Sequence, residues 1–126
     1  MVKKDVVLVC VTGQKTCERL ILEGADIAKG LGAELSVLHV AAHGLNFLGN
    51  PLEGEALEYL YGISSRHGAA MTLIRADDVT RTILHHAEQI DATHLVMGHA
   101  KERVANDVTD GIILLRPDLF IHSIDA

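Results

Sequence analysis

The chain has 126 residues, 48% of them apolar, enough for one buried core and too few for two, so residues 1–126 are expected to form a single domain. The formal net charge is −6 at pH 7 and no basic stripe runs along the sequence, which argues against a nucleic-acid partner and against attraction to anionic membranes. No apolar run approaches the roughly 20 residues that span a bilayer, so we expect a cytoplasmic protein with no membrane insertion.

The N-terminal third predicts two strands and the helix between them. Residues 5–11 are an almost continuous run of β-branched and aliphatic side chains, typical of a strand covered on both faces. Residues 15–32 place apolar side chains at helical spacing and end at Gly32, a natural helix stop. A second buried strand follows over 33–41, and an amphipathic helix is expected over 52–68.

The rest of the chain continues the alternation. The predicted elements are a strand over 70–76, a helix over 77–90, a strand over 92–98, a short helix over 103–115 and a strand over 118–124. Asp77 or Asp78 is expected to cap the third helix. Strands that alternate with helices form right-handed βαβ units. We therefore predict an α/β fold, a three-layer sandwich of four helices around a five-stranded parallel sheet in the order 3-2-1-4-5.

Ligands of such sheets bind beyond the carboxyl ends of the strands, where the strand order reverses. With the first strand between the second and the fourth, this position lies between the first and fourth strands. Residues 11–15, 39–43 and 98–101 should meet there. The connection over 42–51 borders the same place and carries three apolar side chains, which either form a lid over the site or plug the top of the core.

The turn into the first helix is a candidate anion site. Gly13 is expected to allow a tight turn, and the first N–H groups of the helix point toward the site. Lys15 and Lys101 add positive charge. The alternative is an ordinary turn with solvated lysines. The turn lacks the long spacing from a first glycine to Gly-Lys-Ser/Thr that defines the phosphate loop of nucleoside triphosphatases.

The two cysteines do not suggest a disulfide framework. Cys10 lies inside a predicted strand and is expected in the core. Cys17 lies in the first turn of the first helix and is expected to be a partly buried, inert thiol. The alternative is a redox or modification switch, with a pKa lowered by the helix dipole and Lys15.

Eight histidines raise the question of a metal site. His85 and His86 are adjacent on a helix and point about 100° apart, so they cannot chelate together. No cysteine or carboxylate completes a recognised ligand set, and we expect no metal. His39 or His99 is instead expected to contact a ligand, by stacking on a base or donating to a phosphate. No nucleophile lies beside a base in a known motif, so an enzyme is not expected.

Several stretches resemble the universal stress protein family, and the resemblance covers essentially the whole chain. They are VLVCVTGQ at 7–14, GAELSVLHV at 32–40, and the long segment over 56–98. The chain is similar in particular to the universal-stress domains of bacterial potassium-sensing histidine kinases. The resemblance implies an adenine-nucleotide alpha-hydrolase-like fold, a role in stress signalling, and a homodimer formed through the strand at 118–124.

The family also implies ATP binding through a loop after the fourth strand. Its pattern is a glycine, two residues, a second glycine, nine residues, then a third glycine followed by Ser or Thr. Gly98 matches the first glycine and Gly111 keeps the register of the third. Lys101 replaces the second glycine, Ile112 replaces the hydroxyl, and Thr12 stands where the family's first-strand Asp contacts the nucleoside. Lys101 loses the close backbone approach of a glycine but adds a cation, and Ile112 cannot hydrogen-bond a phosphate.

Two functions follow as alternatives. In the first, ATP, another adenine nucleotide or a cyclic dinucleotide binds, with the Val40 backbone on the base and Lys15 and Lys101 on the anion. In the second, the site is closed and the protein acts as a homodimer on a transporter or sensor kinase. The position of the Ile112 side chain distinguishes the two functions. A side chain in the phosphate position would remove the pocket, and a side chain turned into the core would preserve it. The expected site residues are Val11, Thr12, Gly13, Gln14, Lys15, His39, Val40, Gly98, His99, Lys101 and Gly111.

Overall fold

The computed structural model of the chain describes residues 4–99 and 103–125. The elements in chain order are β1 (Val6–Val11), α1 (Gln14–Leu31), β2 (Glu34–Ala41), the short 3-10 helix η1 (Phe47–Gly49), α2 (Glu53–Arg66), β3 (Ala70–Arg75), α3 (Val79–Gln89), β4 (His94–His99), α4 (Arg103–Leu115) and β5 (Phe120–Asp125). Each predicted strand and helix is present, with ends that differ by at most two residues. Among the described residues, η1 is the one element that was not expected.

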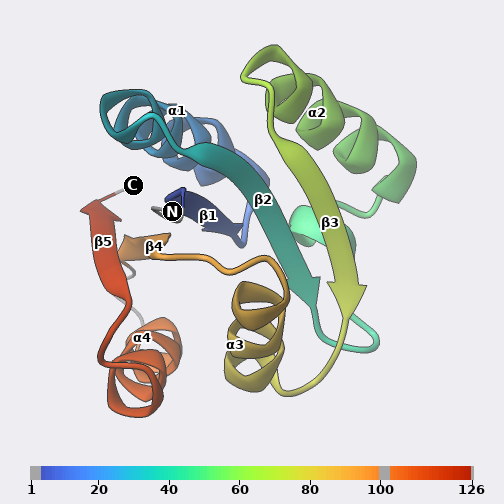
Figure 1. The fold of residues 1–126 in the computed structure, drawn as a ribbon. Helices are drawn as coiled ribbons and strands as arrows, with labels where there is room; N and C mark the ends of the chain where they lie inside the picture. The colour runs from blue at the N-terminus through green and yellow to red at the C-terminus, as the bar shows by residue number, and fades with distance from the viewer. Residues whose placement is uncertain (1–3, 100–102, 126) are drawn as a thin grey trace.

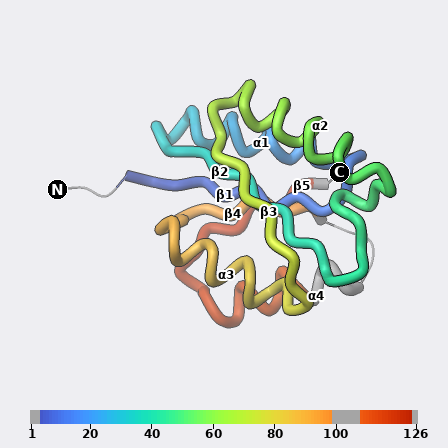
Figure 2. Tube along the Cα trace, turned by 90° about the vertical axis from the view of Figure 1, so that its right-hand side faces the viewer, coloured from blue at the N-terminus to red at the C-terminus, as the bar shows by residue number. Residues whose placement is uncertain are grey.

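The strands form a parallel sheet in the order β3-β2-β1-β4-β5, which confirms the predicted topology. In the central strand, Val9 pairs with Val37 on one side and with Val96 on the other. Helices α1 and α2 cover one face of the sheet and α3 and α4 cover the other (Figures 1 and 2). The predicted three-layer sandwich is therefore confirmed.

The core has two apolar layers, one on each face of the sheet. Val7, Val9 and Val11 point into the layer under α1 and α2, while Leu8 and Cys10 point into the layer over α3 and α4. This alternation is the period-two geometry of a strand, and because both faces are covered, every residue of β1 is buried. Cys10 is in the core, as predicted.

Helix α1 lies unusually close to the sheet at Gly24. A Cβ atom at this position would collide with the Cγ2 atom of Val9, so only glycine fits here. The helix ends at Gly32, which adopts φ 64° and donates to the carbonyl groups of the last turn, as expected of a glycine helix stop. Among the described residues, no helix is long and apolar enough to cross a membrane.

Candidate functional site

The carboxyl ends of β1, β2 and β4 meet at one edge of the sheet and bring most of the expected site residues together. Val11 pairs with His39 in the parallel ladder, and Cys10 pairs with Met97, which places Gly98 beside the end of β1. Thr12 is exposed just beyond β1. His99 ends β4, and Lys101 lies outside the described residues.

A groove of about 710 Å³ opens at this edge, between the start of α1 and the segment before α2. Its lining residues are Gly13, Gln14, Lys15, Thr16, Leu48, Gly49, Asn50, Pro51 and Tyr59. The amide groups of Thr16 and Cys17 bond to the Gly13 carbonyl, so the N–H groups of Gln14 and Lys15 precede the first hydrogen bonds of the helix. The groove therefore joins a helix N-terminus and a lysine on one wall to apolar and amide groups on the other.

The turn into α1 does not depend on its glycine. Gly13 has φ −127° and ψ 155°, an extended conformation that any residue adopts, and an added Cβ would meet no atom within 4 Å. The expectation that Gly13 provides a tight turn is therefore wrong. The open space at this position is instead part of the groove.

His39 is buried beneath this edge and makes two hydrogen bonds. Its Nδ1 atom lies 2.8 Å from the Val11 carbonyl oxygen, and its Nε2 atom accepts from the Leu48 amide at 2.9 Å. Burial lowers the pKa of the imidazole, and the nearby positive charge of Arg75 acts in the same direction. Because both ring nitrogens are engaged within the protein, His39 organises the site rather than presenting its ring to a ligand.

The connection over 42–51 folds down onto the sheet. Leu48 is 3% exposed and belongs to the core layer under α1 and α2, whereas Leu45 is 62% exposed. Leu48 therefore plugs the top of the core, which confirms this alternative for Leu48, whereas Leu45 does not. Phe47 is half-buried and meets the His39 ring edge-on, with 5.8 Å between the ring centroids.

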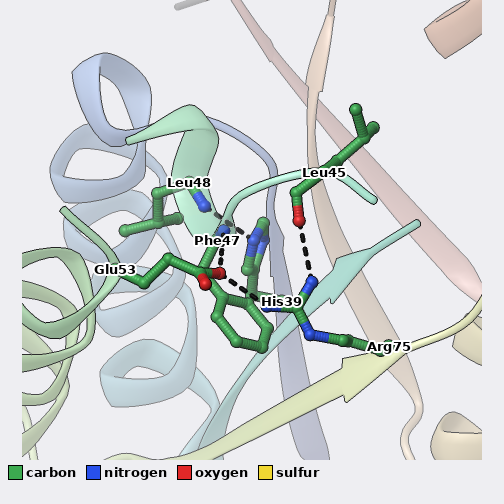
Figure 3. Close-up of polar contacts among 6 residues, drawn as sticks. All are labelled: His39, Leu45, Phe47, Leu48, Glu53 and Arg75. Atoms are coloured by element: carbon green, nitrogen blue, oxygen red, sulfur yellow. Dashed lines mark hydrogen bonds and ion pairs between the residues drawn. The ribbon is translucent and has the colours of Figure 1, made fainter. Parts of the chain in front are cut away.

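Arg75, at the end of β3, fastens the same connection. It donates to the Leu45 carbonyl at 2.8 Å, lies 4.2 Å from the centroid of the Phe47 ring, and pairs with Glu53 of α2 (Figure 3). Glu53 also accepts from the Phe47 amide, and this bond together with Arg75 lowers the pKa of its carboxyl group. The far wall of the groove is thus held by β2, β3 and α2.

The segment after β4 departs from the expected phosphate loop. Helix α4 already begins at Arg103, so the residues between the second and third glycine positions of the family pattern are mostly helical. Gly111 lies eight residues beyond the start of α4, about 12 Å along its axis. A Cβ there would lie 3.2 Å from the Thr80 side chain of α3, so this glycine serves helix packing. Gly111 therefore lies in a packed helix and not in a loop of the kind that the family pattern implied.

Ile112 is fully buried in the core layer over α3 and α4. Its side chain points into the core and does not fill the groove, which is the arrangement that preserves a pocket. Val40 also differs from the groove residues, because its side chain packs into this same layer, on the opposite face of the sheet from Leu48.

The remaining candidates are structural. Burial raises the pKa of the Cys17 thiol, the reverse of the lowered value that a redox role requires, so the inert thiol is favoured. Asp78 caps α3 by accepting from the Arg81 amide at 3.0 Å. Within residues 4–99 and 103–125 no group of three or more metal-ligating side chains comes together.

Asn50, Pro51, Tyr59 and Arg75 were missed by sequence reasoning. Asn50 donates to the Gln14 side chain at 2.9 Å and so links the two walls of the groove. One signal was available for Arg75, because a charged residue at the carboxyl end of a buried strand lies at the ligand-binding edge of the sheet. Tyr59 carried no such signal, since exposed tyrosines are common on amphipathic helices.

The chain is similar to known proteins in both sequence and structure. The universal stress protein family model matches residues 4–113. Sensor protein KdpD from two strains of Mycobacterium tuberculosis is 33% identical over 99 residues, which cover 78% of this chain and 11% of that protein. The chain therefore spans a small part of the length of these relatives.

Solved structures share the fold. A universal stress family protein from Burkholderia pseudomallei superposes with a TM-score of 0.71 and 21% identity, covering 97% of this chain and 96% of that one. A universal stress protein in complex with cAMP gives a TM-score of 0.71 at 13% identity and 98% coverage of both chains. One from Archaeoglobus fulgidus in complex with dAMP gives 0.62 at 18% identity, covering 99% of this chain and 100% of that one.

Proposed function

This chain belongs to the universal stress protein family, and on that premise we propose that it is a stress-signalling module that binds an adenine mononucleotide in the groove beside α1 and does not cleave it. The observation that carries the proposal is the groove itself, which sets Lys15 and the N-terminus of α1 opposite Leu48, Asn50 and Tyr59. Two proteins of the same fold are described in complex with cAMP and with dAMP, both of which are mononucleotides.

The anion end of the groove suits a single phosphate. The N–H groups of Gln14 and Lys15 and the lysine side chain form one locus of positive potential. In the family's ATP pattern a long glycine loop after the fourth strand holds further phosphates, and here α4 takes most of its place. We therefore expect a mononucleotide to bind at least as tightly as ATP.

Other residues that line the groove suit a base. Tyr59 offers a half-exposed ring for stacking, and Leu48 and Pro51 supply apolar surface. The side-chain amides of Gln14 and Asn50 carry donors and acceptors that can exchange their mutual bond for the edge of a base. The backbone contact expected for Val40 stays a prediction.

Calorimetric titration tests the proposal, with AMP, cAMP, ATP and cyclic-di-AMP compared on the same protein. We expect binding of a mononucleotide, and a Lys15→Ala variant that binds it about 5- to 10-fold more weakly because a charge-assisted contact is lost. Lys29→Ala, at the other end of α1, is the matched control and should bind as the wild type does. Absence of heat with all four nucleotides, or equal affinity of both variants, would contradict the proposal.

A second function is favoured by an apolar surface elsewhere. Ile113, Leu114 and Leu115 at the end of α4 are 48%, 80% and 62% exposed, and Phe120 on the edge strand β5 is 63% exposed. Exposed apolar side chains beside an unpaired strand edge are typical of a protein interface. We propose a homodimer through residues 118–124, acting in the cytoplasm on a regulatory partner such as a transporter or sensor kinase.

Sedimentation equilibrium tests this second proposal on the intact chain. The wild type should sediment as a dimer, and Phe120→Lys, which places a charge on the exposed face of β5, should shift it toward the monomer. Tyr61→Lys, at a tyrosine of α2 that is 62% exposed, is the control and should leave the mass unchanged. A wild type that is monomeric at every concentration would remove the homodimer.

A further inference from the structure

One imidazole joins the end of β1 to one wall of the groove. The Nδ1 atom of the His39 ring lies 2.8 Å from the Val11 carbonyl oxygen. Its Nε2 atom accepts from the Leu48 amide at 2.9 Å (Figure 3). Val11 is the last residue of β1, and Leu48 begins the groove-lining segment 48–51. The ring is therefore the direct link between the end of the sheet and this segment.

This bridge requires one protonation state. A carbonyl oxygen only accepts hydrogen bonds, so Nδ1 must carry the hydrogen that faces Val11. An amide N–H only donates, so Nε2 must carry a lone pair toward Leu48. Only the neutral ring with hydrogen on Nδ1 satisfies both. A protonated ring would set two N–H groups against each other and lose the bond to Leu48.

Burial and the charge of Arg75 oppose protonation of the His39 ring, while its bond to the Val11 carbonyl favours it. From β3, Arg75 adds positive charge, and from α2, Glu53 is already paired with that arginine. From β1 the facing polar group is the Val11 carbonyl, and α1 contributes the buried thiol of Cys17 to the same core layer. Burial of the ring and the charge of Arg75 outweigh the bond to Val11 and lower the pKa of His39, so the bridge is intact at neutral pH.

The segment is also held against a local preference. Leu48 adopts φ 54°, the left-handed region that is unfavourable for a residue with a Cβ. Its buried side chain and its bond to His39 keep it there. Loss of the bond removes one of these restraints while the unfavourable conformation remains.

We propose that His39 is the positioning residue of the groove, and that protonation of its ring releases the wall over 48–51, so that the groove loses its ligand on acidification. The release of the wall stands on the geometry alone. The loss of ligand rests on the proposed nucleotide function. The release of the wall and the loss of the ligand are therefore measured separately.

The release is measured as the protection of the Leu48 amide against hydrogen exchange, by NMR on the full chain at about pH 7.5 and about pH 5. In the wild type we expect the protection factor to fall at least about 10-fold as the His39 ring titrates, with the ring carrying hydrogen on Nδ1 at the higher pH. Continued protection of Leu48 after the ring is protonated, or a ring with hydrogen on Nε2, would overturn the proposal.

Two amide variants separate positioning from packing. His39→Gln places an acceptor near the position of Nε2, so Leu48 should stay protected at both pH values. His39→Asn keeps a donor near Nδ1 but is too short to reach Leu48, which should exchange rapidly at both. His67→Gln, at an exposed histidine that ends α2, should keep the wild-type profile. Equal pH profiles in His39→Gln and the wild type would refute the role of the ring.

Ligand binding is measured with cAMP, because a cyclic phosphate keeps one negative charge over this range while the phosphate of AMP titrates at about pH 6. We expect affinity for cAMP to fall at least about 10-fold on acidification in the wild type and less than about 3-fold in His39→Gln. If Leu48 is released but cAMP binds at neither pH, the proposed function fails for cAMP, and the release of the wall over 48–51 stands. If cAMP binds equally at both pH values while Leu48 is released, the coupling between them is wrong.

Discussion

The Nδ1 atom of His94 on β4 lies 3.0 Å from the Nε2 atom of His122 on β5, and the two rings are within 19° of parallel. Phe120 continues the stack, with its ring centroid 4.8 Å from that of His94. Two imidazoles can share this hydrogen bond only while one of them is neutral, since one ring must accept. The pair therefore fastens the edge strand to the sheet in a way that depends on pH.

This arrangement predicts that the free energy of unfolding falls on acidification. Burial and the charge of His94 lower the pKa of His122, and burial lowers those of His39 and His86. A base with a lowered pKa in the folded state contributes stability that is complete above its unfolded value of about 6.5. This stability is lost as the pH falls below that value and through the lowered folded value. Urea unfolding followed by circular dichroism, from about pH 8 to about pH 5, should show this loss.

Replacing His122 measures its contribution to the pH dependence of the free energy of unfolding. His122→Ala should cost about 1 kcal/mol at neutral pH and should flatten part of the pH dependence. His67→Ala removes an exposed histidine and should leave the pH dependence as it is. A His122→Ala curve parallel to that of the wild type would show that the pair does not titrate as described.

Both thiols should be unreactive in the native protein. Burial raises the pKa of Cys10 to about 12 and also raises that of Cys17, so neither forms a thiolate at neutral pH. With Ellman's reagent we expect both thiols to react only after the chain is unfolded in urea. Fast reaction of one thiol in the native state, assigned by a Cys17→Ala variant, would restore a redox role for Cys17.

Ile112→Thr introduces the hydroxyl that the family's ATP pattern has at this position. Because the side chain points into the core, we expect destabilisation by about 1–3 kcal/mol from the buried hydroxyl and no gain in affinity for ATP. Ile113→Thr, at a residue 48% exposed, should change stability by less than about 0.5 kcal/mol. Tighter ATP binding in Ile112→Thr would mean that this residue lies at a phosphate site after all.

Two glycines of α1 form a matched pair for packing. Gly24→Ala should destabilise by more than about 2 kcal/mol, because its Cβ would collide with Val9 in the rigid centre of the sheet. Gly30→Ala has no atom within 4 Å of the added Cβ and should stabilise by about 0.5–1 kcal/mol through helix propensity. Thermal unfolding of both variants checks this, and similar shifts in the two would contradict the close contact.

The sequence alone determined the order of elements, the topology of the sheet and most of the core. These properties follow from short-range patterns, since the period of the apolar residues distinguishes strand from helix and the alternation of the two dictates parallel pairing. The edge at which residues 11–15 and 39–40 gather was predictable for the same reason, because parallel strands end together.

Only the tertiary structure decided the roles of the individual site candidates. Gly111 has the spacing of a phosphate-loop glycine but packs against Thr80, because its segment is helical. His39 looked like a ligand contact and is instead bonded to Val11 and Leu48. Such bonds join residues 28 and 9 positions apart in the chain, and they depend on distances and directions in space that no local spacing encodes.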